Sequence, residues 1–412
     1  MNPGPPSLMR ERSLLKLFGP RQSARAAGLL AALALCVAAA GPSVRAQRAR
    51  GAAAVGGAAP YANPVFDEDF PDPTVIRASD GWFYACATNT NIGGRVYHIQ
   101  AARSRDLVSW ERLPDVLPTK PAWSSQHDLL WAPDVHQRGR TFYMYFSNRL
   151  NDDLAARFKR ENNAKTSKED VFCLGAATAA SPRGPFTDSG RPLRCGLSFV
   201  NIDPMAFDDP RTGRKYLFWG SGFQPIRVQE LATDRLSFKA GSRPVELVAA
   251  KKELPYQTLI EGAWVVYRRG FYYLFFSGEN CCHGPLQQIK YAVLVARAKN
   301  ITGPYQTLAQ ARGGQSSAIL ERSDAWIAPG HNSVVEDDAG QSWIAYHAID
   351  VNRPYMTTTL KDDRNVRRVM LLDRLSFRGG WPLVEGSGQP SKGARPAPVV
   401  RRGRSSAGRG RR

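Results

Sequence analysis

Long apolar stretches are almost absent from this chain of 412 residues. The longest run, residues 26–40, is shorter than the roughly 20 residues that a helix needs to cross a membrane, so we predict no membrane-spanning segment. Arg10, Lys16 and Arg25 precede this run, and small residues suited to signal-peptidase cleavage follow it as far as Ala46. This order indicates a secretory signal peptide at residues 1–46, with a membrane anchor as the alternative. We expect the mature protein to be secreted or periplasmic.

Acidic residues are scarce at both ends of the chain. Residues 1–50 carry eight Lys or Arg and one acid, and residues 391–412 carry eight Lys or Arg and no acid. The body between them holds 40 basic and 35 acidic residues, so most of the net charge of +20 lies at the ends. A nearly balanced body excludes a basic nucleic-acid platform, and we expect no nucleic-acid partner. Composition predicts a flexible linker at residues 47–61 and a disordered basic tail at residues 389–412.

Cysteine is sparse, at six residues, and one of them leaves with the signal peptide. The five that remain are Cys86, Cys173, Cys195, Cys281 and Cys282. No pair of CxxC motifs and no His pair stands at metal-ligand spacing, so we do not expect these cysteines to bind a metal. Cys173 and Cys195 flank a turn-rich segment and are the favoured disulfide. The adjacent Cys281 and Cys282 form either a vicinal disulfide or two thiols.

Helical periodicity is also lacking, and the middle of the chain instead repeats a Gly-containing turn followed by an aromatic strand. The five aromatic strands follow Gly81, Gly139, Gly213, Gly270 and Gly340. A second aromatic element follows each copy, and its last aromatic residue recurs about every 67 residues. This repetition predicts an all-β, five-bladed β-propeller that forms a single domain at residues 62–388, with a two-domain β-sandwich as the alternative.

Three motifs place a carboxylate where turn or apolar residues are usual. They are Asp69-Phe70-Pro71-Asp72-Pro73, Trp131-Ala132-Pro133-Asp134 and Ile260-Glu261-Gly262. Each stands at the start of the innermost strand of a predicted blade, so Asp72, Asp134 and Glu261 should converge near the axis. Glu261 follows apolar residues, and a dry environment favours the protonated carboxyl that a general acid needs. Asp72 by itself could equally be a turn residue.

The chain resembles glycoside hydrolase family 43 from about Asn63 to Val384. The resemblance rests on the three carboxylate motifs and, in the family's order, on Asn63-Pro64-Val65, Asn201-Ile202-Asp203-Pro204 and Ala328-Pro329-Gly330-His331-Asn332-Ser333. It implies a single catalytic domain that hydrolyses glycosidic bonds with inversion. The expected substrates are polysaccharides that contain arabinose or xylose, and some galactans.

The resemblance also implies roles for the acids. Asp72 is expected to be the general base, Glu261 the general acid, and Asp134 the residue that tunes and positions the acid. Asp203 either anchors a strand or touches the sugar, and Arg368 is expected near the terminal sugar.

A cofactor is not expected for the chemistry itself. By resemblance, His331 is expected on the propeller axis beside a structural Ca²⁺ ion that it holds through waters. The alternative is a buried histidine that is paired with backbone groups.

Aromatic side chains could stack on sugar rings, and Trp131, Trp264 and Phe223 are the candidates. The adjacent cysteines at 281–282 are similar to those of arabinan-degrading members, so we expect cleavage of α-L-arabinofuranosyl bonds in arabinan or arabinoxylan. We also expect a monomer. Exo and endo action stay open. A β-xylosidase or galactanase of the same family is the first alternative, and a carbohydrate-binding propeller without catalysis is the second.

Overall fold

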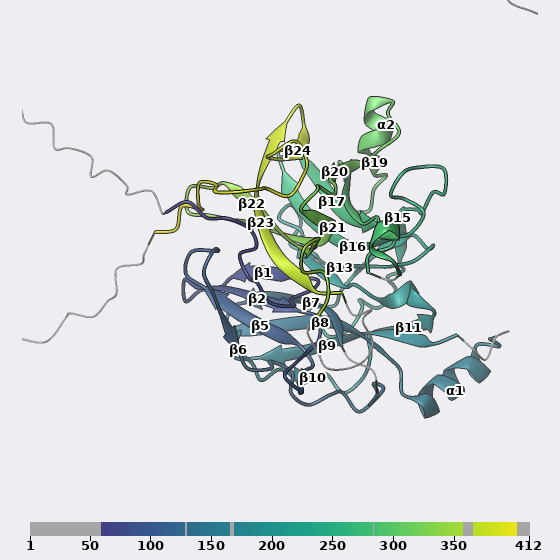
Figure 1. Cartoon of the computed structure of the whole chain (residues 1–412). Helices are drawn as coiled ribbons and strands as arrows, with labels where there is room; N and C mark the ends of the chain where they lie inside the picture. Colours follow the sequence, from purple (N-terminus) through teal and green to yellow (C-terminus); the bar gives the residue numbers. More distant parts are fainter. Residues whose placement is uncertain (1–58, 128–129, 165–168, 283, 357–365, 402–412) are drawn as a thin grey trace, which may run out of the picture. The chain divides into compact units, whose positions relative to one another are not determined.

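The computed structural model describes residues 59–401, except 128–129, 165–168, 283 and 357–365. The expected signal peptide and most of the expected linker lie outside the described residues. Five antiparallel sheets follow one another along the chain, and each is built outward from an innermost strand (Figure 1). The innermost strands are β1 (Thr74–Arg77), β7 (Trp131–Arg138), β12 (Met205–Asp208), β16 (Ile260–Arg268) and β21 (Trp326–Glu336).

Each innermost strand contacts those of the neighbouring blades, in the order β1, β7, β12, β16, β21 and back to β1. This ring of five strands around one axis defines a five-bladed propeller, and the predicted fold is confirmed. The second strands are β2 (Phe83–Ala87), β8 (Thr141–Arg149), β13 (Lys215–Trp219), β17 (Phe271–Gly278) and β22 (Ser342–Asp350). The third strands are β5 (Gln100–Ser104), β9 (Val171–Ala179), β14 (Ile226–Glu230), β18 (Ala292–Ala298) and β23 (Arg368–Arg378).

Outer strands complete the blades and add three variations. The fourth strands are β6 (Trp110–Leu113), β10 (Thr187–Asp188), β15 (Val245–Val248), β19 (Gln306–Thr307) and β24 (Trp381–Val384). The other short strands are β3 (Thr90–Ile92) with its partner β4 (Arg95–Tyr97), β11 (Arg194–Leu197) on β9, and β20 (Ala318–Leu320) on β18. The helical elements are α1 (Asp152–Glu161), α2 (Leu308–Arg312) and the 3₁₀ turns η1 (Phe199–Asn201) and η2 (Leu286–Gln288). None of the helices in the described part of the chain has the length and apolar character needed to cross a membrane.

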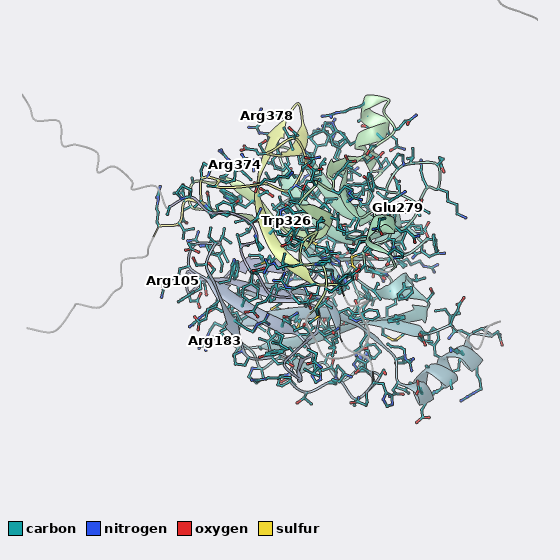
Figure 2. All side chains as sticks on the ribbon, in the orientation of Figure 1. Arg105, Arg183, Glu279, Trp326, Arg374 and Arg378 are labelled. Atoms are coloured by element: carbon teal, nitrogen blue, oxygen red, sulfur yellow. A yellow bond between two sulfur atoms is a disulfide. The ribbon has the colours of Figure 1, made fainter. Side chains whose placement is uncertain are left out.

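The aromatic repeats form the second strands, which lie in the middle of each blade. In β17 every residue after Phe271 is buried, and in β22 every residue before Asp350 is buried. A strand covered on both faces by neighbouring blades reads as a continuous apolar run rather than an alternating one. Trp326, at the start of β21, is also buried in this core (Figure 2).

The two ends of the propeller are joined through the last blade. Tyr61 pairs with Arg395, and the backbone N–H of Phe70 donates to the carbonyl of Arg368 in β23. Ser391 donates its N–H to Asp373. Residues 389–401 therefore pack on the fifth blade, and the expectation of a disordered tail from residue 389 is wrong for this part. Residues 402–412 lie outside the described residues.

Candidate active site

Each blade carries a left-handed residue at or just before the start of its innermost strand, or, in the fourth and fifth blades, within it. These five residues are Asp72 (φ 56°), Ala132 (φ 45°), Asp203 (φ 59°), Gly262 (φ 62°) and His331 (φ 47°). A positive φ is costly for residues other than glycine, and it recurs here in every blade. Three of the five positions carry a titratable side chain, namely Asp72, Asp203 and His331. The pattern therefore places these three groups at equivalent points of their blades.

Four of these left-handed residues donate their backbone N–H to a polar side chain on or just after the second strand of the preceding blade. The bonds are Ala132 to Thr88 Oγ1 at 2.8 Å, Asp203 to Ser147 Oγ at 2.9 Å, His331 to Ser277 Oγ at 2.8 Å, and Asp72 to His347 Nδ1 at 3.1 Å. In the fourth blade, Gly262 donates instead to Asp203 Oδ2 at 3.2 Å. The acceptors lie on or just after the second strands, so each blade fixes the start of the next.

Asp72 lies beside one arginine and two histidines. Its Oδ1 is 3.0 Å from Arg368 Nη1, 3.1 Å from His347 Nδ1 and 3.4 Å from His331 Nδ1, and its Oδ2 accepts from Thr88 at 2.5 Å. Burial alone would raise the pKa of Asp72, but Arg368 and the two histidines outweigh it and hold this pKa well below its usual value. Asp72 is therefore a carboxylate near neutral pH.

Glu261 is held by two hydroxyl groups. Ser221 donates to its Oε2 and Tyr291 donates to its Oε1, both at 2.7 Å. Burial, followed by the nearby charge of Glu261, raises the pKa of Tyr291 well above its usual value, so Tyr291 stays a donor. Glu261 itself is only partly buried.

Asp203 is the acid beside Glu261. Its Oδ2 accepts from the N–H of Gly262, the residue that follows Glu261. Burial and then the charges of Glu261 and Asp72 raise the pKa of Asp203 well above its usual value. The three carboxyls of Asp72, Asp203 and Glu261 form one electrostatic cluster.

Asp134 was expected beside Glu261, and the structure places it elsewhere. It stands two residues beyond the left-handed Ala132, so it is further along its strand than Asp72 is in the first blade. Its oxygens contact the ring of His136 at 2.8 Å, the N–H of Ala206 at 2.7 Å and Thr74 at 3.4 Å. None of these bonds reaches Glu261. Asp134 ties the first three blades together, and the equivalence of the motifs assumed from the sequence is wrong by two residues.

The three candidate aromatic residues differ in accessibility. Trp131 is partly buried and heads a stack with Phe172 and Phe199, at ring-centroid distances of 5.1 Å from Phe172 and 6.5 Å from Phe199. Phe223 is 67% exposed and follows Ser221, which binds the acid, by two residues. Trp264 is packed in the core and is 9% exposed, and its stacking on a sugar ring stays a prediction.

A small cavity of about 20 Å³ lies among the starts of the innermost strands, with Asp72, Asp134, Trp264, His331 and Asn332 in its lining. Both polar atoms of the Asn332 side chain are buried and have no hydrogen-bonding partner among the described residues. Ca²⁺ takes oxygen ligands, which the Asn332 amide and the nearby carboxylates offer. The polar atoms that line the cavity and the volume of the cavity suit either one water molecule or one cation. Ca²⁺ at this place stays a prediction.

A sequence model of the glycosyl hydrolases of family 43 matches residues 61–382. The chain belongs to glycoside hydrolase family 43. It is 28% identical over 340 residues to a β-D-galactofuranosidase of Aspergillus niger, covering 78% of this chain and 84% of the relative. It is 25% identical to an extracellular exo-α-(1→5)-L-arabinofuranosidase of Cellvibrio japonicus, covering 77% and 86%. The solved structure of an exo-1,5-α-L-arabinanase from a bovine ruminal metagenomic library is similar, with a TM-score of 0.59, 26% identity and coverage of 78% and 99%.

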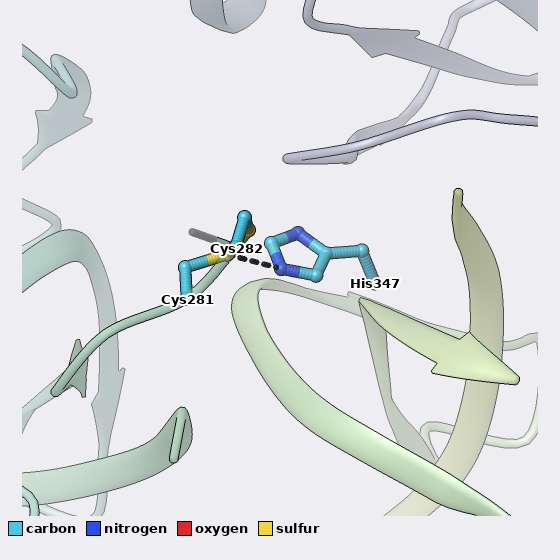
Figure 3. Close-up of side chains that lie close together, drawn as sticks. All are labelled: Cys281, Cys282 and His347. Carbon is cyan, nitrogen blue, oxygen red and sulfur yellow. Dashed lines mark hydrogen bonds between the residues drawn. A yellow bond between two sulfur atoms is a disulfide. The ribbon is translucent and has the colours of Figure 1, made fainter. Parts of the chain in front are cut away.

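Both cysteine pairs of this family 43 chain are disulfides. Cys173 and Cys195 join β9 to β11, which confirms the favoured bridge, and Cys281 is bonded to its neighbour Cys282. The two sulfurs of the second pair and Nε2 of His347 lie within 4.8 Å of one another (Figure 3). Metal ligation needs thiolates, which a disulfide lacks, so the pair is not a metal site in this state.

Three site residues were missed from the sequence: Ser221, Tyr291 and His347. Ser221 and Tyr291 stand in no motif, and only the fold brings them to Glu261. His347 did carry a signal, because it interrupts the apolar second strand of the fifth blade. A fully buried histidine in such a strand needs a partner, and here the partner is Asp72.

Proposed function

We propose that this family 43 glycoside hydrolase inverts the anomeric centre and cleaves α-L-arabinofuranosyl bonds in arabinan or arabinoxylan. The observation that carries the proposal is the opposed shift of two carboxyls in one site: the pKa of Asp72 is held well below its usual value, and the pKa of Asp203, which contacts the N–H of Gly262 next to Glu261, is raised well above it. Inversion requires one ionised carboxylate that acts as the base and one protonated carboxyl that acts as the acid.

Asp72 acts as the general base. It accepts a proton from a water molecule as the water attacks the anomeric carbon, and Arg368 and Thr88 hold the carboxylate in place during the step. The backbone N–H of Asp72 donates to Nδ1 of His347, and this hydrogen bond helps to fix the position of Asp72.

Glu261 acts as the general acid and protonates the departing glycosidic oxygen. Asp203 takes the role first assigned to Asp134. Burial and then the charges of Glu261 and Asp72 raise the pKa of Asp203, so Asp203 is the acid of this cluster that keeps its proton most readily. The hydroxyls of Ser221 and Tyr291 set the orientation of the Glu261 carboxyl.

A β-D-galactofuranoside is the second candidate substrate, since one of the relatives is named for that activity. Both sugars are five-membered rings, and galactofuranose carries one additional exocyclic carbon. We expect the shape of the pocket wall, rather than the acids, to determine which of the two sugars is cleaved.

Secretion, a monomeric state and Ca²⁺ on the axis are parts of the same proposal. Secretion is supported by the signal-like segment at residues 1–46 and by the extracellular relative from Cellvibrio japonicus. Monomeric state is checked by light scattering of the mature chain.

The deciding experiment follows linear arabinan by proton NMR with wild-type protein and Glu261→Gln. We expect the first product to carry the inverted anomeric configuration, and the variant to lose about 10²–10⁴-fold in rate. Glu253→Gln, on the exposed loop before β16, is the matched control. Retention of configuration, or full activity in Glu261→Gln, would refute the mechanism, while activity only on galactofuranosides would change the substrate.

A further inference from the structure

The Cys281–Cys282 disulfide contacts both groups that hold the general base. Cys281 Sγ lies 3.3 Å from His347 Nε2 and 3.8 Å from Arg368 Nη1 (Figure 3). His347 Nδ1 and the same Arg368 nitrogen lie 3.1 Å and 3.0 Å from Asp72 Oδ1. The disulfide is therefore connected to the Asp72 carboxylate in two ways, once through the side chain of His347 and once through that of Arg368.

The contacts of His347 bear on which ring nitrogen carries the proton. Nδ1 lies 3.1 Å from both the N–H and Oδ1 of Asp72: the tautomer with hydrogen on Nε2 accepts from the N–H, and the opposite tautomer donates to Oδ1. A disulfide sulfur has no hydrogen and can only accept, so Nε2–H donates to Cys281 Sγ. The disulfide and the backbone of Asp72 thus require the same tautomer. Burial lowers the pKa of His347 to about 4, which keeps the ring neutral.

Comparison of the blades shows what the histidine adds. Thr88, Ser147 and Ser277 accept the equivalent N–H groups through a hydroxyl, so a hydroxyl is sufficient for that bond. An imidazole at position 347 supplies a second nitrogen, and this nitrogen reaches the sulfur. The ring also stacks on Tyr291, at 5.7 Å between centroids, and Tyr291 donates to Glu261.

We propose that the Cys281–Cys282 disulfide is a redox-sensitive positioning element for the catalytic base, acting through His347 and Arg368. The inference rests on the proposed function. Reduction by a dithiol breaks the S–S bond, two electrons and two protons pass to the sulfurs, and the reductant closes to a cyclic disulfide. Each new S–H is a donor. Donation from sulfur to Nε2 favours the opposite tautomer, in which Nδ1–H no longer accepts from the N–H of Asp72 and donates to Asp72 Oδ1 instead.

The test uses the full chain carrying Cys173→Ser and Cys195→Ser, so that a reductant acts on a single disulfide. We expect dithiothreitol to lower kcat on arabinan about tenfold, the rate equivalent of about one hydrogen bond, with KM within twofold and recovery on reoxidation. His347→Asn is designed to keep an acceptor for the Asp72 N–H without the link to sulfur. Its kcat should not respond to dithiothreitol.

Nitrogen NMR of histidine-labelled protein gives a readout that needs no substrate. We expect the Nε2–H tautomer of His347 in the oxidised protein, and its loss on reduction. A kcat unchanged by reduction, or an unchanged tautomer, overturns the proposal. If no glycoside is cleaved at all, the proposed function fails, and the tautomer measurement still decides whether the disulfide controls His347.

Discussion

Replacement of Arg368 by methionine should shift the acid limb of the pH profile upward. Arg368 Nη1 lies 3.0 Å from Asp72 Oδ1 in a largely buried site. At that distance, and with an effective dielectric constant of about 20, two unit charges attract by about 5 kcal/mol. Arginine neighbours of this kind lower the pKa of an aspartate by about 1–3 units. The pKa of Asp72 should rise by roughly that amount when the charge is removed.

The direction of the shift follows from the role of Asp72. A base must be ionised, so kcat/KM falls when the pH drops below the pKa of Asp72 in the free enzyme. In the wild-type protein this pKa is well below its usual value, so activity should persist to low pH. The depressed pKa also stabilises the fold above the unfolded value of about 3.9, and this contribution is lost as the pH falls through the folded pKa.

The assay is kcat/KM against pH on a soluble arabinofuranoside, for wild-type protein, Arg368→Met and a control. Arg353→Met is the control, because Arg353 Nη2 lies at the same 3.0 Å from Asp67 Oδ1 but both side chains are about half exposed. We expect the acid limb to rise by roughly 1–3 pH units in Arg368→Met and to stay in place in Arg353→Met. An unshifted limb in Arg368→Met would show that Asp72 is not the base or that Arg368 does not set its charge.

Three further outcomes test the site and its frame. Asp203→Asn should lower kcat and move the alkaline limb of the profile, whereas Asp134→Asn should mainly lower the melting temperature; the reverse pattern would restore the role first predicted for Asp134. Loss of the disulfide in Cys173→Ser/Cys195→Ser, which closes a 22-residue separation, should cost about 3 kcal/mol of unfolding free energy in denaturant titration. If a cation occupies the axial cavity beside His331, chelation should lower the melting temperature and Ca²⁺ should restore it; no change would assign the cavity to water.

The sequence carried enough information for the architecture because the propeller repeats. Five Gly-aromatic strands at a regular spacing can bury their faces only against copies of themselves, which limits the folds available. The acids Asp72 and Glu261 could also be predicted from the sequence, since each interrupts a motif at the start of an innermost strand. The position of each motif relative to the left-handed residue of its blade could not be predicted. Asp134 and Asp72 both follow a proline, but the left-handed residue precedes Pro133 at Ala132 and is Asp72 itself in the first blade.

The partners of the acids could not be predicted, because they stand far from the acids in the sequence. Ser221 and Tyr291 are separated from Glu261 by 40 and 30 residues, and His347 from Asp72 by 275. Such contacts depend on how the strands and blades assemble rather than on local sequence. The ordered segment up to Arg401 was missed for a related reason: its composition is that of a disordered tail, yet Tyr61 and Asp337 provide backbone and carboxylate partners for it.

The left-handed positions explain how two of the three clustered acids are held in place. A residue at positive φ directs its N–H toward the preceding blade, where an acceptor fixes it, and this bond offsets part of the cost of the conformation. Asp72 and Asp203 occupy such positions, so their side chains start from a rigid backbone, as preorganised catalysis requires. Ala132 and Gly262 occupy the same positions and contribute only backbone. Glu261 precedes Gly262 and is the more exposed acid, which suits a group that must meet a departing oxygen. One backbone conformation, repeated five times, thus gives Asp72 and Asp203 rigid, buried positions and leaves Glu261 more exposed, as their proposed roles require.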